Sequence, residues 1–146
     1  MVQQENDITI LPLSNFEFIS DKLQISKVVL YFEKSNIFIP KTTIQNYIKE
    51  NVLSPLIENR YYSKQNILEI YLTVILKEFF TLNEISTILK KIFSFNIQAT
   101  EVYNLFIFTY ENYLFYDNKK EFETELNEFF YIILSLKITK NKILNF

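Results

Sequence analysis

The sequence predicts a mainly helical protein of 146 residues. The chain contains no glycine, the residue that ordinarily supplies the positive backbone angles of hairpin turns and bulges. Apolar residues recur at spacings of three and four, as on the buried face of an amphipathic helix. Thr81-Leu-Asn-Glu84 has the form of a capping box, which marks a helix start. Asparagine tolerates left-handed turns between helices, so such turns are expected at Asn59, Asn96 and Asn118.

The N-terminal part is predicted to contain an arm and two helices. Residues 1–19 have apolar side chains without a helical period, which indicates an extended arm. The next apolar pattern predicts a first helix over about residues 21–33. A second helix of about ten residues begins at Lys41, directly after a proline. It ends before Pro55, because the residue that precedes a proline avoids helical angles.

An extended excursion is expected to separate the second and third helices. Residues 53–62 lack a helical period, and a turn is predicted at Glu58 and Asn59. Ser63 is a good N-cap for a third helix that reaches about Phe80. The capping box described above then begins a fourth helix. These elements together define a predicted module over residues 20–95.

Two further helices are predicted to form a C-terminal region over residues 99–146. The fifth helix covers about residues 100–116 and is apolar on nearly all sides, which indicates that it is sandwiched between other elements. Asn118 and Glu121 have the spacing of a second capping box and predict the start of the sixth helix. We expect this region to mediate dimerisation or to receive an effector.

The composition excludes several classes of function. The chain has no histidine and no cysteine, so it lacks the usual general base, thiolate nucleophile and zinc ligands. Without glycine it cannot form a phosphate-cradling loop of the Walker or dinucleotide type. We therefore expect no enzymatic activity, no metal and no cofactor. The longest apolar run, Phe129–Leu136, is far shorter than the ~20 residues of a membrane span. No membrane association is expected, and the predicted location is the cytoplasm.

Charge is distributed unevenly along the chain. The formal net charge is -2, so no global field attracts nucleic acid. Residues 40–64 nevertheless carry four basic and two acidic side chains, whereas residues 99–136 carry seven acidic and two basic ones. The segment with the positive excess contains the predicted second helix and the extended excursion.

The predicted order of helix, short break, helix, extended excursion, helix and helix is the layout of a winged helix-turn-helix. Four segments resemble the MerR-type DNA-binding domain: Thr43-Ile-Gln-Asn-Tyr47, Leu53-Ser-Pro55, Arg60-Tyr-Tyr-Ser63 and Thr81-Leu-Asn-Glu-Ile85. The chain is more closely similar to domain-of-unknown-function family 1836, a bacterial family whose members share a MerR-like module. This similarity rests on Asn46-Tyr47, Tyr62-Ser63-Lys64 and the aliphatic segment 67–76.

The resemblance implies a sequence-specific regulator of transcription that binds duplex DNA. Its recognition helix would lie in the major groove, and its wing would contact the adjacent phosphate backbone. Glutamine and asparagine can bond adenine bidentately, while helix N-terminal groups and basic side chains suit phosphates. The candidate DNA-binding residues are Lys41, Thr42, Thr43, Gln45, Asn46, Lys49, Asn59, Arg60, Tyr61 and Lys64.

Two positions depart from the MerR-type pattern and raise an alternative to DNA binding. Gln45 occupies a position where that family usually has arginine, and Asn46 replaces its first tyrosine. A protein-interaction module on the same scaffold, without DNA binding, is therefore the alternative function. If DNA is bound, the modest affinity expected of one protomer favours a homodimer through the two C-terminal helices. A small-molecule effector site in the same region stays open, although no motif supports it.

Overall fold

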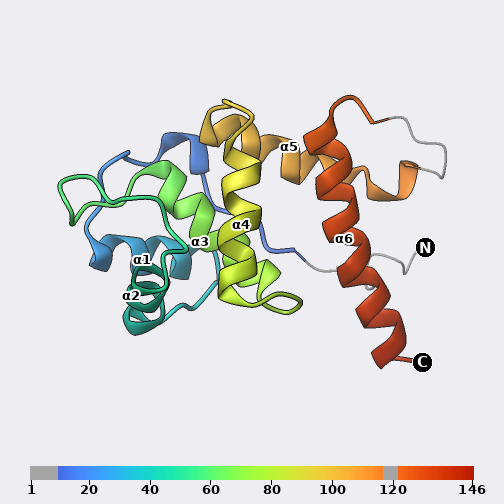
Figure 1. Ribbon diagram of the computed structural model, residues 1–146, viewed down its shortest axis with the longest axis horizontal. Helices are drawn as coiled ribbons and strands as arrows, with labels where there is room; N and C mark the ends of the chain where they lie inside the picture. Colours follow the sequence, from blue (N-terminus) through green and yellow to red (C-terminus); the bar gives the residue numbers. More distant parts are fainter. Residues whose placement is uncertain (1–9, 117–121) are drawn as a thin grey trace. The chain divides into compact units, whose positions relative to one another are not determined.

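The computed structural model describes residues 10–116 and 122–146, and this part of the chain is mainly helical (Figure 1). It contains six α-helices and two short 3-10 turns, and within it no strand is formed. None of these helices is both long enough and apolar enough to cross a membrane. The chain divides into two compact units, one of residues 11–101 and one that includes residues 102–146.

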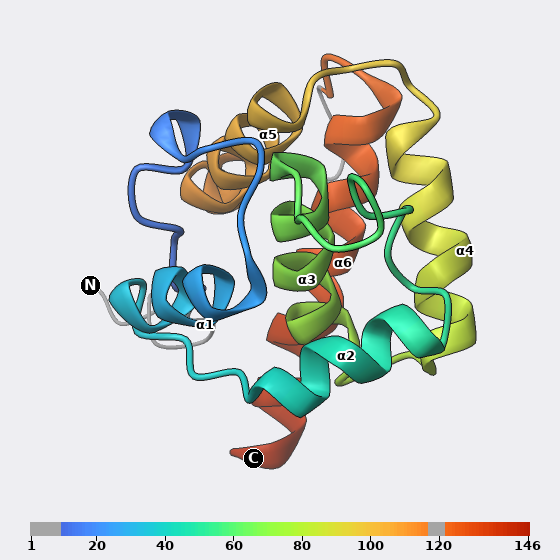
Figure 2. The ribbon, with the colours of Figure 1, turned by 90° about the vertical axis from the view of Figure 1, so that its left-hand side faces the viewer.

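The 11–101 unit has four α-helices. They are α1 (Ile25–Lys34), α2 (Lys41–Lys49), α3 (Lys64–Leu76) and α4 (Leu82–Phe93). α1 packs on α2 and α3 packs on α4, and Figure 2 shows α2 crossing in front of α3. The centre of the unit is α3, because nine of its thirteen residues are buried. A long apolar helix in this position gives the other three helices a common surface to cover.

In the 11–101 unit, the two helix starts predicted from capping residues are confirmed. Ser63 caps α3, because its side chain accepts a hydrogen bond from the Asn66 amide and Asn66 bonds back to the Ser63 amide. Thr81 and Glu84 form the expected capping box of α4. α1, in contrast, begins at Ile25, four residues later than predicted. The reason is that Leu23 exchanges two backbone hydrogen bonds with Tyr62, which holds this segment extended.

The excursion between α2 and α3 makes the predicted turn. Glu58 and Asn59 both adopt left-handed angles, with φ of 53° and 63°, and Ile57 and Tyr61 form an isolated antiparallel bridge around them. We call residues 57–61 the hairpin. The predicted left-handed turn at Asn96 is also found, with φ 58°, whereas Asn118 lies outside the described residues. Among the described residues this segment contains only isolated bridges, so the structure does not confirm the winged helix that was predicted.

The last part of the predicted arm is folded onto the 11–101 unit. Phe16–Phe18 forms a 3-10 turn, η2, and Phe16 is buried. The Ser14 amide donates to Ser35 Oγ at 2.9 Å, and the Tyr71 hydroxyl donates to the Leu11 carbonyl at 2.8 Å. These contacts connect residues 11–16 to α1 and α3.

The second unit is formed by most of α5 (Ala99–Glu111), the 3-10 turn η3 (Tyr113–Phe115) and α6 (Glu125–Leu144). The fifth helix therefore ends at Glu111, short of the predicted Tyr116, and the chain tightens into η3. The two helices pack through apolar side chains, among them Phe106 and Phe130, whose rings meet edge-on at 5.2 Å.

The start of α6 corrects a prediction. Residues Asn118 and Glu121, which suggested a capping box, lie outside the described residues, and α6 begins only at Glu125. Thr124 is the N-cap, because its side chain accepts the Asn127 amide hydrogen bond. Asn127 is itself buried and donates to Thr109 Oγ1 of α5 at 2.8 Å. Phe122 precedes this N-cap and is not helical.

Candidate nucleic-acid interface

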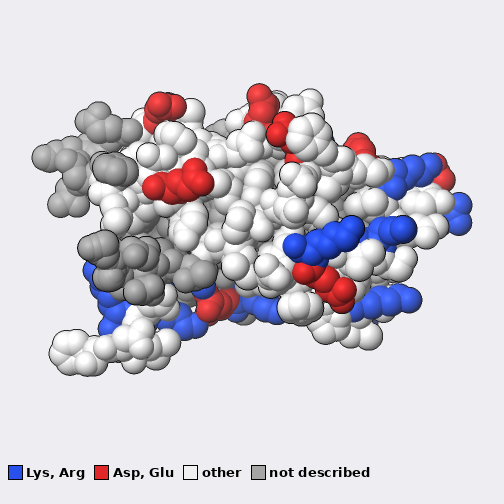
Figure 3. Space-filling view, turned by 180° about the vertical axis from the view of Figure 1, so that it is seen from behind, with Lys and Arg blue, Asp and Glu red and all other residues white. Residues whose placement is uncertain are grey.

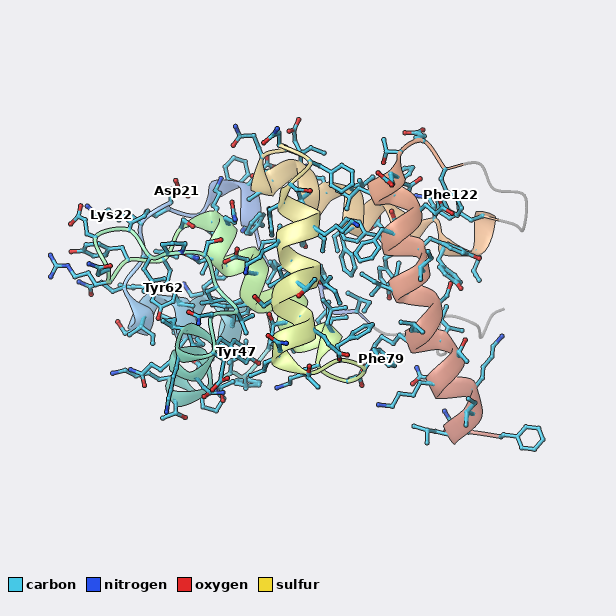
Figure 4. The ribbon with its side chains drawn as sticks, in the orientation of Figure 1. Asp21, Lys22, Tyr47, Tyr62, Phe79 and Phe122 are labelled. Carbon is cyan, nitrogen blue, oxygen red and sulfur yellow. The ribbon has the colours of Figure 1, made fainter. Side chains whose placement is uncertain are left out.

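α2 buries an apolar face and presents a polar one. Ile44 and Tyr47 are at most 2% exposed, and Tyr47 points into the interior of the 11–101 unit (Figure 4). The helical period therefore directs the intervening side chains outward. Of the predicted site residues on α2, Thr43 is half-buried, and the exposed ones are Lys41, Thr42, Gln45, Asn46 and Lys49.

The N-terminus of α2 offers hydrogen-bond donors to an external anion. Its N-cap is Pro40, whose side chain has no group that could accept a hydrogen bond from the first turn. The Pro40 carbonyl accepts the amides of Thr43 and Ile44, at 3.0 and 3.3 Å. The first N–H groups of a helix have no intrahelical acceptor, and the helix dipole adds partial positive charge there. Lys41 and Thr42 therefore stand where a phosphate would be stabilised.

The hairpin carries the chain's single arginine on a compact tip. The Tyr61 ring has the Arg60 guanidinium at 4.8 Å and the Lys22 ammonium at 4.7 Å from its centroid. Lys22 also forms an ion pair with Glu58 at 3.0 Å, and Figure 4 shows Lys22 at this outer end of the molecule's 11–101 unit. These contacts restrict the exposed Arg60 side chain, while Asn59 provides the left-handed turn.

The base of the hairpin is fixed to the segment before α1. Leu23 and Tyr62 exchange backbone hydrogen bonds at 3.0 and 2.7 Å. Tyr62 is 2% exposed and points inward, and its burial raises the pKa of the phenol above the ordinary value of 10.0. The hairpin is thus anchored by a buried side chain directly beside its exposed tip.

Lys64 differs from the other predicted site residues. Its ammonium group donates to the Glu17 carbonyl at 2.6 Å, and its amide donates to the Asp21 carboxylate at 2.8 Å. Lys64 therefore holds residues 17–21 at the start of α3, and its side chain is not part of the exposed row on α2.

A buried carboxylate that the sequence did not single out positions the chain between α2 and the hairpin. Glu69 of α3 is 2% exposed and accepts hydrogen bonds from the amide and hydroxyl of Ser54. It also accepts from the side-chain amides of Gln65 and Asn66, both at 3.1 Å. Asn66 donates in addition to the Ser54 carbonyl at 3.0 Å. Polar residues within an otherwise apolar helix were the only sequence signal for this network.

Basic side chains gather at the end of the 11–101 unit that carries α1, α2 and the hairpin (Figure 3). Residues 21–64 contain seven basic and four acidic side chains. Three exposed lysines at this end lie on α1 or in the segment before it, where no motif marked them as site residues: Lys22, Lys27 and Lys34. This concentration of positive charge lies on the same unit as the exposed face of α2, whereas the net charge of the chain is -2.

One family comparison identifies the chain. A protein-family model described as "Domain of unknown function (DUF1836)" matches residues 16–106. The chain belongs to the DUF1836 family. The DUF1836 match contains α1 to α4 and the hairpin in full, so it covers the whole candidate interface. A search of curated proteins and a search of solved structures found no match. The predicted similarity to this family is therefore confirmed, and the MerR-like description stays a prediction.

Proposed function

We propose that this DUF1836 protein binds duplex DNA as a transcriptional regulator, with α2 in the major groove and the hairpin on the neighbouring phosphate backbone. The observation that carries the proposal is the exposed polar row on α2 together with the exposed arginine-bearing tip of the hairpin, both on the 11–101 unit. The nine residues of α2 extend about 14 Å, which suits a short helix that enters the groove. The hairpin then serves as a wing reduced to one bridge.

Each part of the surface has a distinct role in this proposal. The open N-terminus of α2, with Lys41 and Thr42, receives one phosphate. Gln45 and Asn46 lie about one helical turn further along the exposed row and can bond adenine edges. Lys49 and Arg60 contact phosphates on either side of these bases. The Arg60 guanidinium already lies over the Tyr61 ring, so the Arg60 side chain loses less rotamer entropy when it binds a phosphate.

Fluorescence anisotropy with a labelled duplex pool tests the proposal. The chain should bind duplex at low salt, and the Lys41→Ala/Lys49→Ala/Arg60→Ala variant should bind more weakly. The slope of log K against log salt should fall by about 2 to 3, because each phosphate contact contributes ~0.9. The matched control is Lys77→Ala/Lys90→Ala/Lys91→Ala, which removes three exposed lysines at the end of α3 and on α4.

Two results would contradict DNA binding. One is the absence of duplex binding by the unmodified chain at low salt. The other is an equal loss of affinity in the variant and in the Lys77→Ala/Lys90→Ala/Lys91→Ala control, which would indicate a diffuse charge effect. A protein partner captured through α2 in the absence of DNA binding would instead favour the interaction-module alternative.

A further inference from the structure

α6 has two apolar faces, and only one of them is buried within its own unit. The buried face is formed by Leu126, Phe130, Ile133, Leu134 and Ile138. On the opposite side of the helix, Ile132 is 50% exposed, Leu136 38% and Ile143 70%. A contiguous apolar stripe that faces solvent along a helix commonly marks an interaction surface.

The exposed stripe has the spacing of a coiled-coil seam. Its positions are 129, 132, 136, 139, 143 and 146, which alternate between steps of three and four residues. Five of these six residues are apolar, and the sixth is Thr139. A repeat of this kind keeps one stripe facing a partner helix along its whole length. It runs along α6 from the second turn of the helix, and its last position, Phe146, lies two residues beyond the end of the helix at Leu144.

The surface of α6 also contains a hollow near the C-terminus of the helix. The hollow is lined by Thr139, Lys142, Ile143 and Phe146. Thr139, Lys142 and Ile143 are related as i, i+3 and i+4, which are three of the four positions that form the hole in knobs-into-holes packing, and Phe146 closes the hollow from just beyond the helix. The geometry therefore favours a helical partner over an extended peptide.

Charges on α6 indicate the orientation of that partner. Exposed Glu125 and Glu128 lie in the first turn, while Lys142 lies in the last one. Glu128, Ser135 and Lys142 follow one edge of the stripe at intervals of seven residues. Two parallel copies would place like charges together at both ends. Two antiparallel copies would place the acidic end of each beside the basic end of the other.

We propose that α6 pairs in antiparallel orientation with α6 of a second copy of this chain, through the stripe from Phe129 to Phe146. Side chains of one helix fill the hollows of the other, and Glu128 of each copy lies near Lys142 of its partner. This pairing does not depend on DNA binding by the 11–101 unit. It gives the predicted homodimer a specific surface.

Analytical ultracentrifugation of the full chain tests the pairing. At concentrations up to about 100 μM the chain should sediment at twice 17.6 kDa. Ile143→Glu should raise the dimer dissociation constant by about tenfold or more, because an unpaired charge is costly in an apolar seam. The matched control is Leu144→Glu, whose side chain is equally exposed at 70% but lies off the stripe, and it should sediment as the unmodified chain does.

A charge exchange tests the orientation. Glu128→Lys should weaken the dimer, and Glu128→Lys/Lys142→Glu should restore it, because antiparallel pairing brings these two positions together. Circular dichroism of each variant confirms that the helices are intact. A chain that is monomeric at the highest concentration overturns the proposal, as does an equal response of the Ile143 and Leu144 variants. A double variant as weak as the single one overturns the antiparallel orientation.

Discussion

Removal of the buried Glu69 carboxylate should destabilise the 11–101 unit strongly. Glu69→Ala deprives the Ser54 amide, the Ser54 hydroxyl, Gln65 and Asn66 of their acceptor. A hydrogen bond to a charged group contributes ~1.5–3 kcal/mol, and donors that are left buried without a partner add a desolvation cost. Gln65 and Ser54 are half-buried and can bond water instead, so the desolvation cost of their unpaired groups is only partial. The expected decrease in the free energy of unfolding is about 3–5 kcal/mol.

Urea denaturation followed by circular dichroism measures this decrease, and two variants provide the comparison. Glu69→Gln keeps the size of the side chain and one acceptor oxygen, so it should cost about 1–2 kcal/mol. Glu33→Ala removes an exposed carboxylate of α1 and should change stability by less than about 0.5 kcal/mol. Amide hydrogen exchange at Ser54 should accelerate in Glu69→Ala. A decrease similar to that of Glu33→Ala would refute the assigned role of Glu69.

Three further predictions concern single side chains. Tyr47→Phe should leave stability unchanged or raise it by about 1 kcal/mol, and calorimetry measures the change. The reason is that the Tyr47 hydroxyl is buried without a hydrogen-bond partner among the described residues. The raised pKa of Tyr62 keeps its phenol neutral in the folded chain at pH values where the phenol ionises in the unfolded chain. The free energy of unfolding should therefore fall as the pH rises through and above 10.0. Urea titrations across this range should show a shallower fall in Tyr62→Phe. Thr81→Ala should lower stability by about 1 kcal/mol through loss of the α4 capping box, and an equal melting temperature in both proteins would contradict this.

Local signals explain why much of the 11–101 unit was predictable. Pro40, Ser63 and Thr81 act within a few residues of their own positions, so their effects can be inferred from the sequence. The hairpin turn followed from Asn59 in a chain without glycine, since few other residues accept a left-handed angle. The exposed row on α2 followed from its helical period.

The features that were missed depend on partners distant in sequence. α1 begins late because Leu23 pairs with Tyr62, thirty-nine positions away in the numbering. For the same reason the sequence could not show that Lys64 would bond the Glu17 carbonyl instead of facing outward with α2.

Chemical-shift mapping tests the central claim most directly. The backbone amides of the full chain are followed by NMR while duplex DNA is added at low salt. DNA binding through α2 and the hairpin predicts that the largest changes fall on residues 41–46 and 58–61, and that the Lys41→Ala/Lys49→Ala/Arg60→Ala variant loses them. Spectra that do not change, or changes concentrated on α4 or α6, would contradict the account.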